Sequence, residues 1–288
     1  MQENINKIKF AFFGTSEFSV IILDELKAKG FVPRLVVTME DKPKGRKLIL
    51  SPPKVKIWAE KEGVKYIQLK TLRKPESEEI IKSFSPEGFD IFIVASYGKI
   101  IPQNILDIPK CKTLNVHPSL LPKLRGPSPI ESAILKENET GVTIMRLDAE
   151  MDHGPIVAQK KMDMAWPPYA DDLEKILGKI GGQMLGDLLL DWIFGKIPEQ
   201  EQNDSLATLC QKIQKNDALI NLEDDSEINL RKIRAYHVWP GAHFFLKDKT
   251  RIIIKRAHVE NDKLILDRIV PEGKKEMDYK DFIRNQSG

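Results

Sequence analysis

Three polar residues in the middle of the chain have the types and spacing needed for chemistry on a carbonyl group. Asn115 and His117 lie two apart at the end of an apolar run, so in a strand both side chains point to one face. An amide can donate to a developing oxyanion, and an imidazole can move a proton near neutral pH. Asp152 follows about 35 residues later in a predicted tight loop, from which a carboxylate within reach of His117 would orient the ring.

The loop after His117 is rich in residues that restrict the backbone. Two prolines and a glycine hold it around Ser119-Leu120-Leu121-Pro122 and Arg125-Gly126. A plainer interpretation, a capped loop with an incidental histidine, stays open beside the catalytic one. The chain has no Gly-x-Ser-x-Gly elbow and no His-Glu-x-x-His motif, so covalent acyl transfer and zinc hydrolysis lack their parts.

A second candidate ligand site follows the apolar strand predicted at 91–95. Tyr97, Gly98 and Lys99 come directly after this strand, where open α/β sheets hold their ligands. A glycine lets the backbone approach a flat ligand closely, although a simple turn is an equally good interpretation. The earlier turn at Gly14 has one glycine where a dinucleotide fingerprint has three, so we interpret it as a helix cap.

The elements that must position these residues alternate between buried strands and amphipathic helices. This alternation predicts an α/β fold with a doubly wound, Rossmann-like and mainly parallel sheet. The predicted strands cover 8–13, 32–38, 64–68, 91–95, 113–116, 142–147 and 156–161. The predicted helices cover 17–29, 54–62, 76–84 and 171–194.

The 288 residues are enough for two domains. Residues 195–205 are polar and lack an apolar period, so they predict a linker between a catalytic domain at 1–194 and a C-terminal domain at 206–288. In that domain a helix at 228–235 precedes short strands at 242–246, 251–258 and 263–270. Short strands divided by turns are typical of a small barrel or sandwich.

Composition limits the class of protein. A hydrophobic fraction of 41% with 30% charged residues excludes a disordered chain, a collagen and a coiled coil. No apolar run approaches the ~18 residues of a membrane span. The two cysteines, Cys111 and Cys210, have no metal-ligand spacing around them, so we expect no metal. Two cysteines in a chain of this length, beginning without a secretory or transit pattern, predict a cytoplasmic enzyme.

Positive charge is concentrated near the C-terminus. The whole chain has a net charge of +3, but residues 228–275 hold 12 basic and 5 acidic residues. A basic region behind a neutral body hints at a polyanionic partner. The plainer interpretation is solvated surface.

Longer stretches of the sequence resemble a known family. NVHPSLLPKLRGPSPI followed by MDHGPI is similar to the folate-dependent formyltransferases, and within them to the methionyl-tRNA formyltransferases. The Asn-x-His and Asp-x-Gly patterns mark only the superfamily. The runs FFGTSEFSV, ETGVTIMRLDAEMD, IRAYHVWPGAHFFL and PEGKKEM extend the resemblance from about residue 8 to residue 282.

The resemblance implies transfer of a formyl group from 10-formyltetrahydrofolate to the α-amine of methionyl initiator tRNA. It makes Asn115, His117 and Asp152 the catalytic residues, with a monomer and an OB-like C-terminal β-barrel. It places the folate against two segments that follow neighbouring strands. These cofactor-binding residues are Tyr97, Gly98, Lys99, Ile100, Ser119, Leu120, Leu121 and Pro122.

The resemblance also implies that the loop at 40–54 binds the acceptor stem, although this loop is shorter than is usual in the family. The basic C-terminal region predicts a second tRNA-binding surface. The residues assigned to the loop are Lys42, Lys44, Arg46 and Lys47. Those assigned to the C-terminal domain are Arg251, Lys255, Arg256, Lys274 and Lys275.

Three other functions stay open. Sugar-nucleotide N-formyltransferases share the Asn-x-His and Asp pattern but do not need the basic loop. A formyl-folate hydrolase would use the same three residues with water as the acceptor. A nucleic-acid-binding protein on an inactive enzyme body would have no reason to keep all three.

Overall fold

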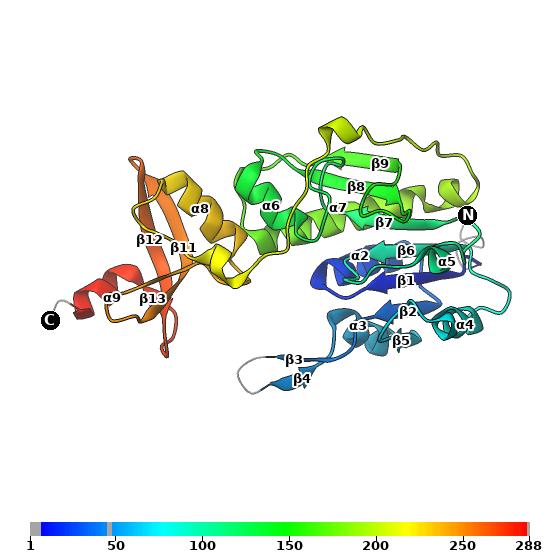
Figure 1. The fold of residues 1–288 in the computed structure, drawn as a ribbon, viewed down its shortest axis with the longest axis horizontal. Helices are drawn as coiled ribbons and strands as arrows, with labels where there is room; N and C mark the ends of the chain where they lie inside the picture. Colours follow the sequence, from blue (N-terminus) through cyan, green and yellow to red (C-terminus); the bar gives the residue numbers. More distant parts are fainter. Residues whose placement is uncertain (1–6, 45–47, 287–288) are drawn as a thin grey trace. The chain divides into compact units, whose positions relative to one another are not determined.

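In the computed structural model, which describes residues 7–44 and 48–286, the chain forms two compact units (Figure 1). The first comprises Met1–Pro127, Gly141–Met162 and Lys175–Leu209. The second comprises Ser128–Thr140, Asp163–Glu174 and Cys210–Gly288. The boundaries at 194 and 206 stay a prediction, and the predicted linker lies within the first unit. None of the described helices is long and apolar enough to cross a membrane.

A seven-stranded sheet forms the centre of the first unit (Figure 1). Its order is β5-β2-β1-β6-β7-β8-β9, and the pairs from β5 to β7 are parallel. β8 and β9 are added antiparallel. The strands are β1 (Phe10–Gly14), β2 (Leu35–Thr38), β5 (Tyr66–Gln68), β6 (Ile91–Ala95), β7 (Thr113–His117), β8 (Gly141–Arg146) and β9 (Ile156–Lys161). The predicted doubly wound, mainly parallel sheet is confirmed.

Helices pack on both faces of this sheet. One face of β1, β2 and β6 joins a buried cluster with Ile81 and Ile105, in which Phe13 contacts Phe92 and Tyr97. The opposite face of β7 meets a long helix through Val116. The helices are α2 (Glu17–Ala28), α3 (Lys54–Glu62), α4 (Pro75–Ser83), α5 (Gln103–Leu106) and α7 (Ala170–Ile193).

Glycines let α7 approach its neighbours closely. A Cβ on Gly181 would lie 2.6 Å from Val116 Cγ1 in β7, and one on Gly182 would lie 2.7 Å from the Cβ of Glu25 in α2. Both distances are shorter than real Cβ contacts, so a side chain at either position would force the helix away from its neighbour.

The second unit contains a four-stranded antiparallel sheet, β10-β11-β12-β13. The predicted C-terminal β domain is confirmed in this form. The guanidinium of Arg231 in α8 donates to the carbonyl oxygens of Ile134 and Glu137 at the end of α6. The elements of this unit are α6 (Pro129–Lys136), α8 (Ser226–Ala235), β10 (His243–Phe245), β11 (Arg251–Glu260), β12 (Lys263–Pro271), β13 (Met277–Asp278) and α9 (Tyr279–Gln286).

The predicted loop at 40–54 contains two short strands, β3 (Lys42–Lys44) and β4 (Ile49–Ser51), which pair antiparallel (Figure 1). No apolar alternation in this segment predicts strands. β4 exposes apolar side chains, with Ile49 at 63% and Leu50 at 66%.

Candidate active site

β7 carries Asn115 and His117 in the interior of the sheet. Asn115 pairs in register with Val94 of β6 and Met145 of β8, while His117 pairs with Thr143. Asn115 is 8% exposed and His117 is 4% exposed. Because alternate residues of a strand share a face, both polar side chains lie on the side of β7 opposite to Val116.

The loop between β8 and β9 brings Asp152 to His117. The Asp152 Oδ1 atom lies 3.6 Å from His117 Nδ1, and its Oδ2 accepts a 2.8 Å hydrogen bond from the backbone N–H of Gly126. Asp152 has a φ of 52°, in the left-handed region. A Cβ on Gly154 would lie 2.0 Å from the backbone oxygen of Arg146, so only glycine fits there. The structure thus brings together the predicted imidazole and carboxylate.

Both ring nitrogens of His117 face oxygen atoms. Nε2 lies 3.0 Å from the Leu124 carbonyl oxygen, and Nδ1 faces the Asp152 carboxylate. A neutral imidazole has one N–H, whereas the protonated ring has two. A neutral ring can therefore donate to only one of these two oxygen atoms at a time.

The Ser119–Pro122 segment is fixed by side chains from β8 and β9. Thr143 Oγ1 donates to the Ser119 carbonyl oxygen at 2.7 Å and accepts from the Leu121 N–H at 3.1 Å. Gln159 Nε2 donates to the Leu121 carbonyl oxygen at 2.8 Å. These bonds hold the segment directly after β7, although nothing in the sequence marks Thr143 or Gln159 as its supports.

In the segment after β6, the aromatic ring of Tyr97 is buried in the core. Tyr97 is 2% exposed and packs edge-on to Phe13, and burial raises the pKa of its hydroxyl. The Lys99 ammonium donates to the carbonyl oxygens of Leu69 and Lys70, and burial lowers its pKa. Gly98 has a φ of 84°, and Ile100 is 74% exposed.

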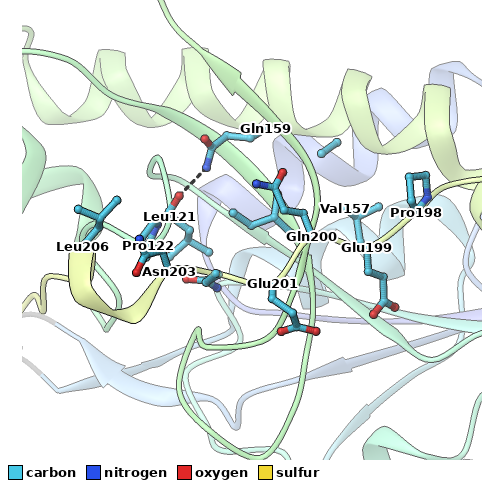
Figure 2. A pocket seen from close by; sticks show the side chains of 13 residues that line it. Leu121, Pro122, Val157, Gln159, Pro198, Glu199, Gln200, Glu201, Asn203 and Leu206 are labelled. Atoms are coloured by element: carbon cyan, nitrogen blue, oxygen red, sulfur yellow. Dashed lines mark hydrogen bonds between the residues drawn. The ribbon is translucent and has the colours of Figure 1, made fainter.

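A cavity of about 520 Å³ lies between β9 and residues 198–206. Its wall includes Leu121 and Pro122, whose segment is joined to Gln159 by the hydrogen bond drawn in Figure 2. The side chains of Glu199 and Glu201 lie on the other wall (Figure 2). Of the residues predicted to bind folate, Leu121 and Pro122 line this cavity, whereas residues 97–100 do not.

Gln202, in the predicted linker, is a contact residue of the site that sequence reasoning missed. Its Nε2 donates to the carbonyl oxygens of Asp152 at 2.9 Å and Gly154 at 2.7 Å. Its Oε1 accepts from Arg125, which also pairs with Asp204 at 2.8 Å. The Arg125 guanidinium holds the pKa of Asp204 below its usual value. No local pattern around residue 202 signals these distant contacts.

The basic residues predicted to bind tRNA have different surroundings. Arg46 and Lys47 lie outside the described residues, as does the side chain of Lys44, while Lys42 is exposed in β3. In the second unit Lys274 and Lys275 are exposed in the turn before β13.

Three other predicted tRNA residues have partners in their own unit. The Arg256 guanidinium lies 5.4 Å from the centre of the Tyr169 ring. Lys255 Nζ donates to the His237 carbonyl oxygen at 3.4 Å. Arg251 lies 3.1 Å from His243 Nδ1. Arg251 and Lys255 are half-buried, whereas Arg256, Lys274 and Lys275 are exposed.

The described residues contain no group of three or more His, Cys, Asp or Glu side chains arranged to hold a metal ion. His153, next to the catalytic aspartate candidate, contacts Asp148 at 2.9 Å and Asp204 at 3.6 Å. The hydrogen bond to Asp148 raises the pKa of His153.

Comparisons with known proteins match both the N-terminal and the C-terminal part of the chain to formyl transferases. Residues 6–187 match the family model described as formyl transferase, and residues 212–265 match that of the formyl transferase C-terminal domain. The methionyl-tRNA formyltransferase of Thermotoga maritima is 41% identical over 240 residues, which are 83% of this chain and 76% of that protein. The corresponding protein of Campylobacter curvus is 42% identical over 233 residues, 80% of this chain and 75% of the relative.

Solved structures share the fold at lower identity. The methionyl-tRNA formyltransferase from Clostridium thermocellum matches with a TM-score of 0.59 and 17% identity, covering 92% of this chain and 98% of that one. A 4-N formyltransferase from Francisella tularensis matches with a TM-score of 0.67 and 17% identity, covering 88% and 98%.

Proposed function

The chain belongs to the methionyl-tRNA formyltransferase family, and from this premise we propose that it transfers the formyl group of 10-formyltetrahydrofolate to the α-amine of methionyl initiator tRNA. The observation that carries the proposal is the 3.6 Å approach of His117 Nδ1 to Asp152 Oδ1, with Asn115 two residues away on the same strand face. These residues lie within the region that matches the formyl transferase model.

The reaction proceeds by direct transfer, without an acyl-enzyme. The methionyl nitrogen attacks the formyl carbon, and the carbonyl oxygen becomes an oxyanion. Asn115 donates a hydrogen bond to this oxyanion, and His117 does so by exchanging its contact with the Leu124 carbonyl oxygen for one with the oxyanion. The bond from the formyl carbon to N10 of the folate then breaks. The attacking amine loses a proton and N10 gains one, so an acid–base residue serves both steps, with Asp152 orienting His117.

The folate lies against the two segments that follow β6 and β7. Residues 97–100 offer backbone groups around Gly98, and residues 119–122 offer a segment held in place by Thr143 and Gln159. No metal takes part in this scheme, because the charge that develops is stabilised by Asn115 and His117.

Met-tRNA is held by two basic surfaces, one at residues 42–47 and the other in the C-terminal unit, where Lys274 and Lys275 are exposed. Phosphate contacts of this kind make affinity strongly dependent on salt. A cytoplasmic location and a monomeric state, expected from the sequence, are part of the same proposal.

The proposal is tested by incubating the protein with 10-formyltetrahydrofolate labelled in the formyl group. Met-tRNA, free methionine, an aminosugar nucleotide and water alone are compared as acceptors. We expect label on Met-tRNA only. Label on the aminosugar, or label released as formate at the same rate without an acceptor, would contradict the proposal and favour a sugar-nucleotide formyltransferase or a hydrolase.

A further inference from the structure

The carboxamide of Gln202 uses all of its hydrogen-bonding groups to join two loops of the candidate site. Its two N–H groups donate to the carbonyl oxygens of Asp152 and Gly154, and its oxygen accepts from two nitrogen atoms of Arg125. An amide has two donor hydrogens and one acceptor oxygen with two lone pairs, so these four bonds saturate it. A side chain in this state holds both loops in place.

These bonds close a ring around Asp152. The Asp152 carboxylate accepts from the N–H of Gly126, its carbonyl oxygen accepts from Gln202, and Gln202 is bonded to Arg125, which precedes Gly126. Asp152 is therefore held at its side chain and at its backbone. Its φ of 52° is a conformation that residues other than glycine keep only when their surroundings enforce it.

We propose that Gln202 is a positioning residue for formyl transfer, and that it keeps the Asp152 carboxylate beside His117 by fixing the backbone of the Asp152 loop. The inference rests on the proposed function, in which Asp152 orients His117. At 3.6 Å the two side chains already lie beyond hydrogen-bond distance, so a further shift of the loop would separate them.

The alternative is a purely structural role, in which Gln202 only attaches the segment at 195–209 to the rest of its unit. Other contacts already do this. The backbone of Gln200 makes two hydrogen bonds with Ile156, of 2.7 and 2.9 Å, and Glu199 pairs with Arg146 at 2.7 Å. Thr208 is bonded to the backbone of Leu124 at 2.9 Å. Removing the Gln202 carboxamide therefore leaves the segment attached but removes the two hydrogen bonds that hold the backbone of the Asp152 loop.

Two substitutions separate the positioning role from simple attachment. Gln202→Ala removes all four bonds. Gln202→Glu keeps acceptors for Arg125 but replaces the donor with a carboxylate oxygen that cannot donate to the two carbonyl oxygens. Gln211→Ala is the matched control, because Gln211 is an exposed glutamine beyond the segment whose backbone carbonyl, rather than its side chain, accepts a hydrogen bond.

The measurement is kcat and KM for formylation of Met-tRNA by the full chain, with thermal unfolding of each variant. We expect both Gln202 variants to lose about 10- to 100-fold in kcat, because small misplacements of reacting groups have effects of this size, with KM changed less than about threefold. Gln211→Ala should match the wild type.

A wild-type kcat in Gln202→Glu would overturn the proposal, since attachment to Arg125 would then be sufficient. If Gln202→Ala does not fold, Gln202→Glu alone decides. Asp152→Ala, measured beside them, separates a failure of the proposed function from a failure of the positioning role of Gln202. A wild-type protein that does not formylate Met-tRNA defeats the proposed function, whereas a loss in Asp152→Ala with normal Gln202 variants defeats only the inference.

Discussion

The candidate active site and the C-terminal unit place their polar side chains differently. In the active site, His117 and Asp152 are held in fixed positions, whereas in the C-terminal unit lysines are exposed. His117 is 4% exposed, and its carboxylate partner is held by the N–H of Gly126. Lys274 and Lys275 stand in an exposed turn and face solvent. The first arrangement suits a role that depends on exact geometry, whereas the second suits electrostatic attraction of a polyanion.

This difference predicts different responses to change. A buried group acts through its geometry, so shifting it lowers the rate of the chemical step. An exposed cation acts through phosphate contacts and counterion release, so removing it weakens binding and lowers the salt dependence. The predictions below test this division, beginning with the largest effect.

Asn115→Ala should have the largest effect, because it removes a donor to the oxyanion from a nearly buried position. Loss of one such donor typically costs about 10²–10³ in kcat. Steady-state formylation of Met-tRNA measures it, with circular dichroism to verify the fold. A folded variant with near-normal kcat would exclude Asn115 from the site.

Gly181→Ala tests whether packing behind β7 supports the site. The added Cβ would lie 2.6 Å from Val116, which is next to both Asn115 and His117 in the strand. Overpacking costs about 1–3 kcal/mol, partly offset by about 1 kcal/mol of helix propensity. We expect lower thermal stability together with lower kcat.

Gly186→Ala is the matched control on the same helix. Its Cβ would meet the side chain of Lys29, whose ammonium contacts the Gln183 carbonyl oxygen and Asp187 and would have to shift. Because these are contacts of a partly exposed lysine and not of the strand, the variant should lose less stability than Gly181→Ala. Equal behaviour of the two alanine variants would show that packing of α7 against β7 does not support the site.

Lys274→Ala combined with Lys275→Ala should weaken tRNA binding by an amount that depends on salt. Each phosphate contact contributes about 0.7–0.9 to the slope of log K against log salt concentration, so two lost contacts lower the slope by about 1.5. Binding of Met-tRNA at several salt concentrations measures it. An unchanged slope would mean that these lysines are solvated surface.

The smallest predicted effect concerns His153. Its hydrogen bond to Asp148 raises its pKa, so the pair stabilises the fold fully below the ordinary histidine pKa of about 6.5 and loses this effect as pH rises through the folded pKa. The difference in melting temperature between the wild type and His153→Ala should therefore shrink from pH 6 to pH 8. In an Asp148→Asn background this pH dependence should be reduced, and a difference that grows with pH would refute the assignment.

The sequence predicts those parts of the fold and site that depend on local patterns. The strand at Ile91–Ala95 is a continuous apolar run, and its bounds agree with the prediction. Asn115 and His117 share a face because residues two apart in any strand do so. The position of Asp152 on a tight loop is predicted from the glycine that follows it, Gly154, and the structure shows that this glycine has no room for a side chain.

What the sequence does not predict depends on contacts between distant residues. Gln202 bonds to residues 50 and 77 positions away, and its own segment looks like a polar linker. The pairing of β3 with β4 has no apolar alternation to reveal it. The exposed lysines were predicted as one surface with Arg251, Lys255 and Arg256, and only the structure shows that these three have partners in their own unit.

The central claim is that chemistry and tRNA affinity reside in different residues, and single-turnover formylation over a series of protein concentrations tests it most directly. Asn115→Ala should lower the maximal rate about 10²–10³-fold without moving the half-saturating concentration. The Lys274→Ala and Lys275→Ala pair should raise that concentration and leave the maximal rate unchanged. A lysine pair that lowers the maximal rate as much as Asn115→Ala, or an Asn115→Ala variant that reaches the wild-type maximum, would contradict the account.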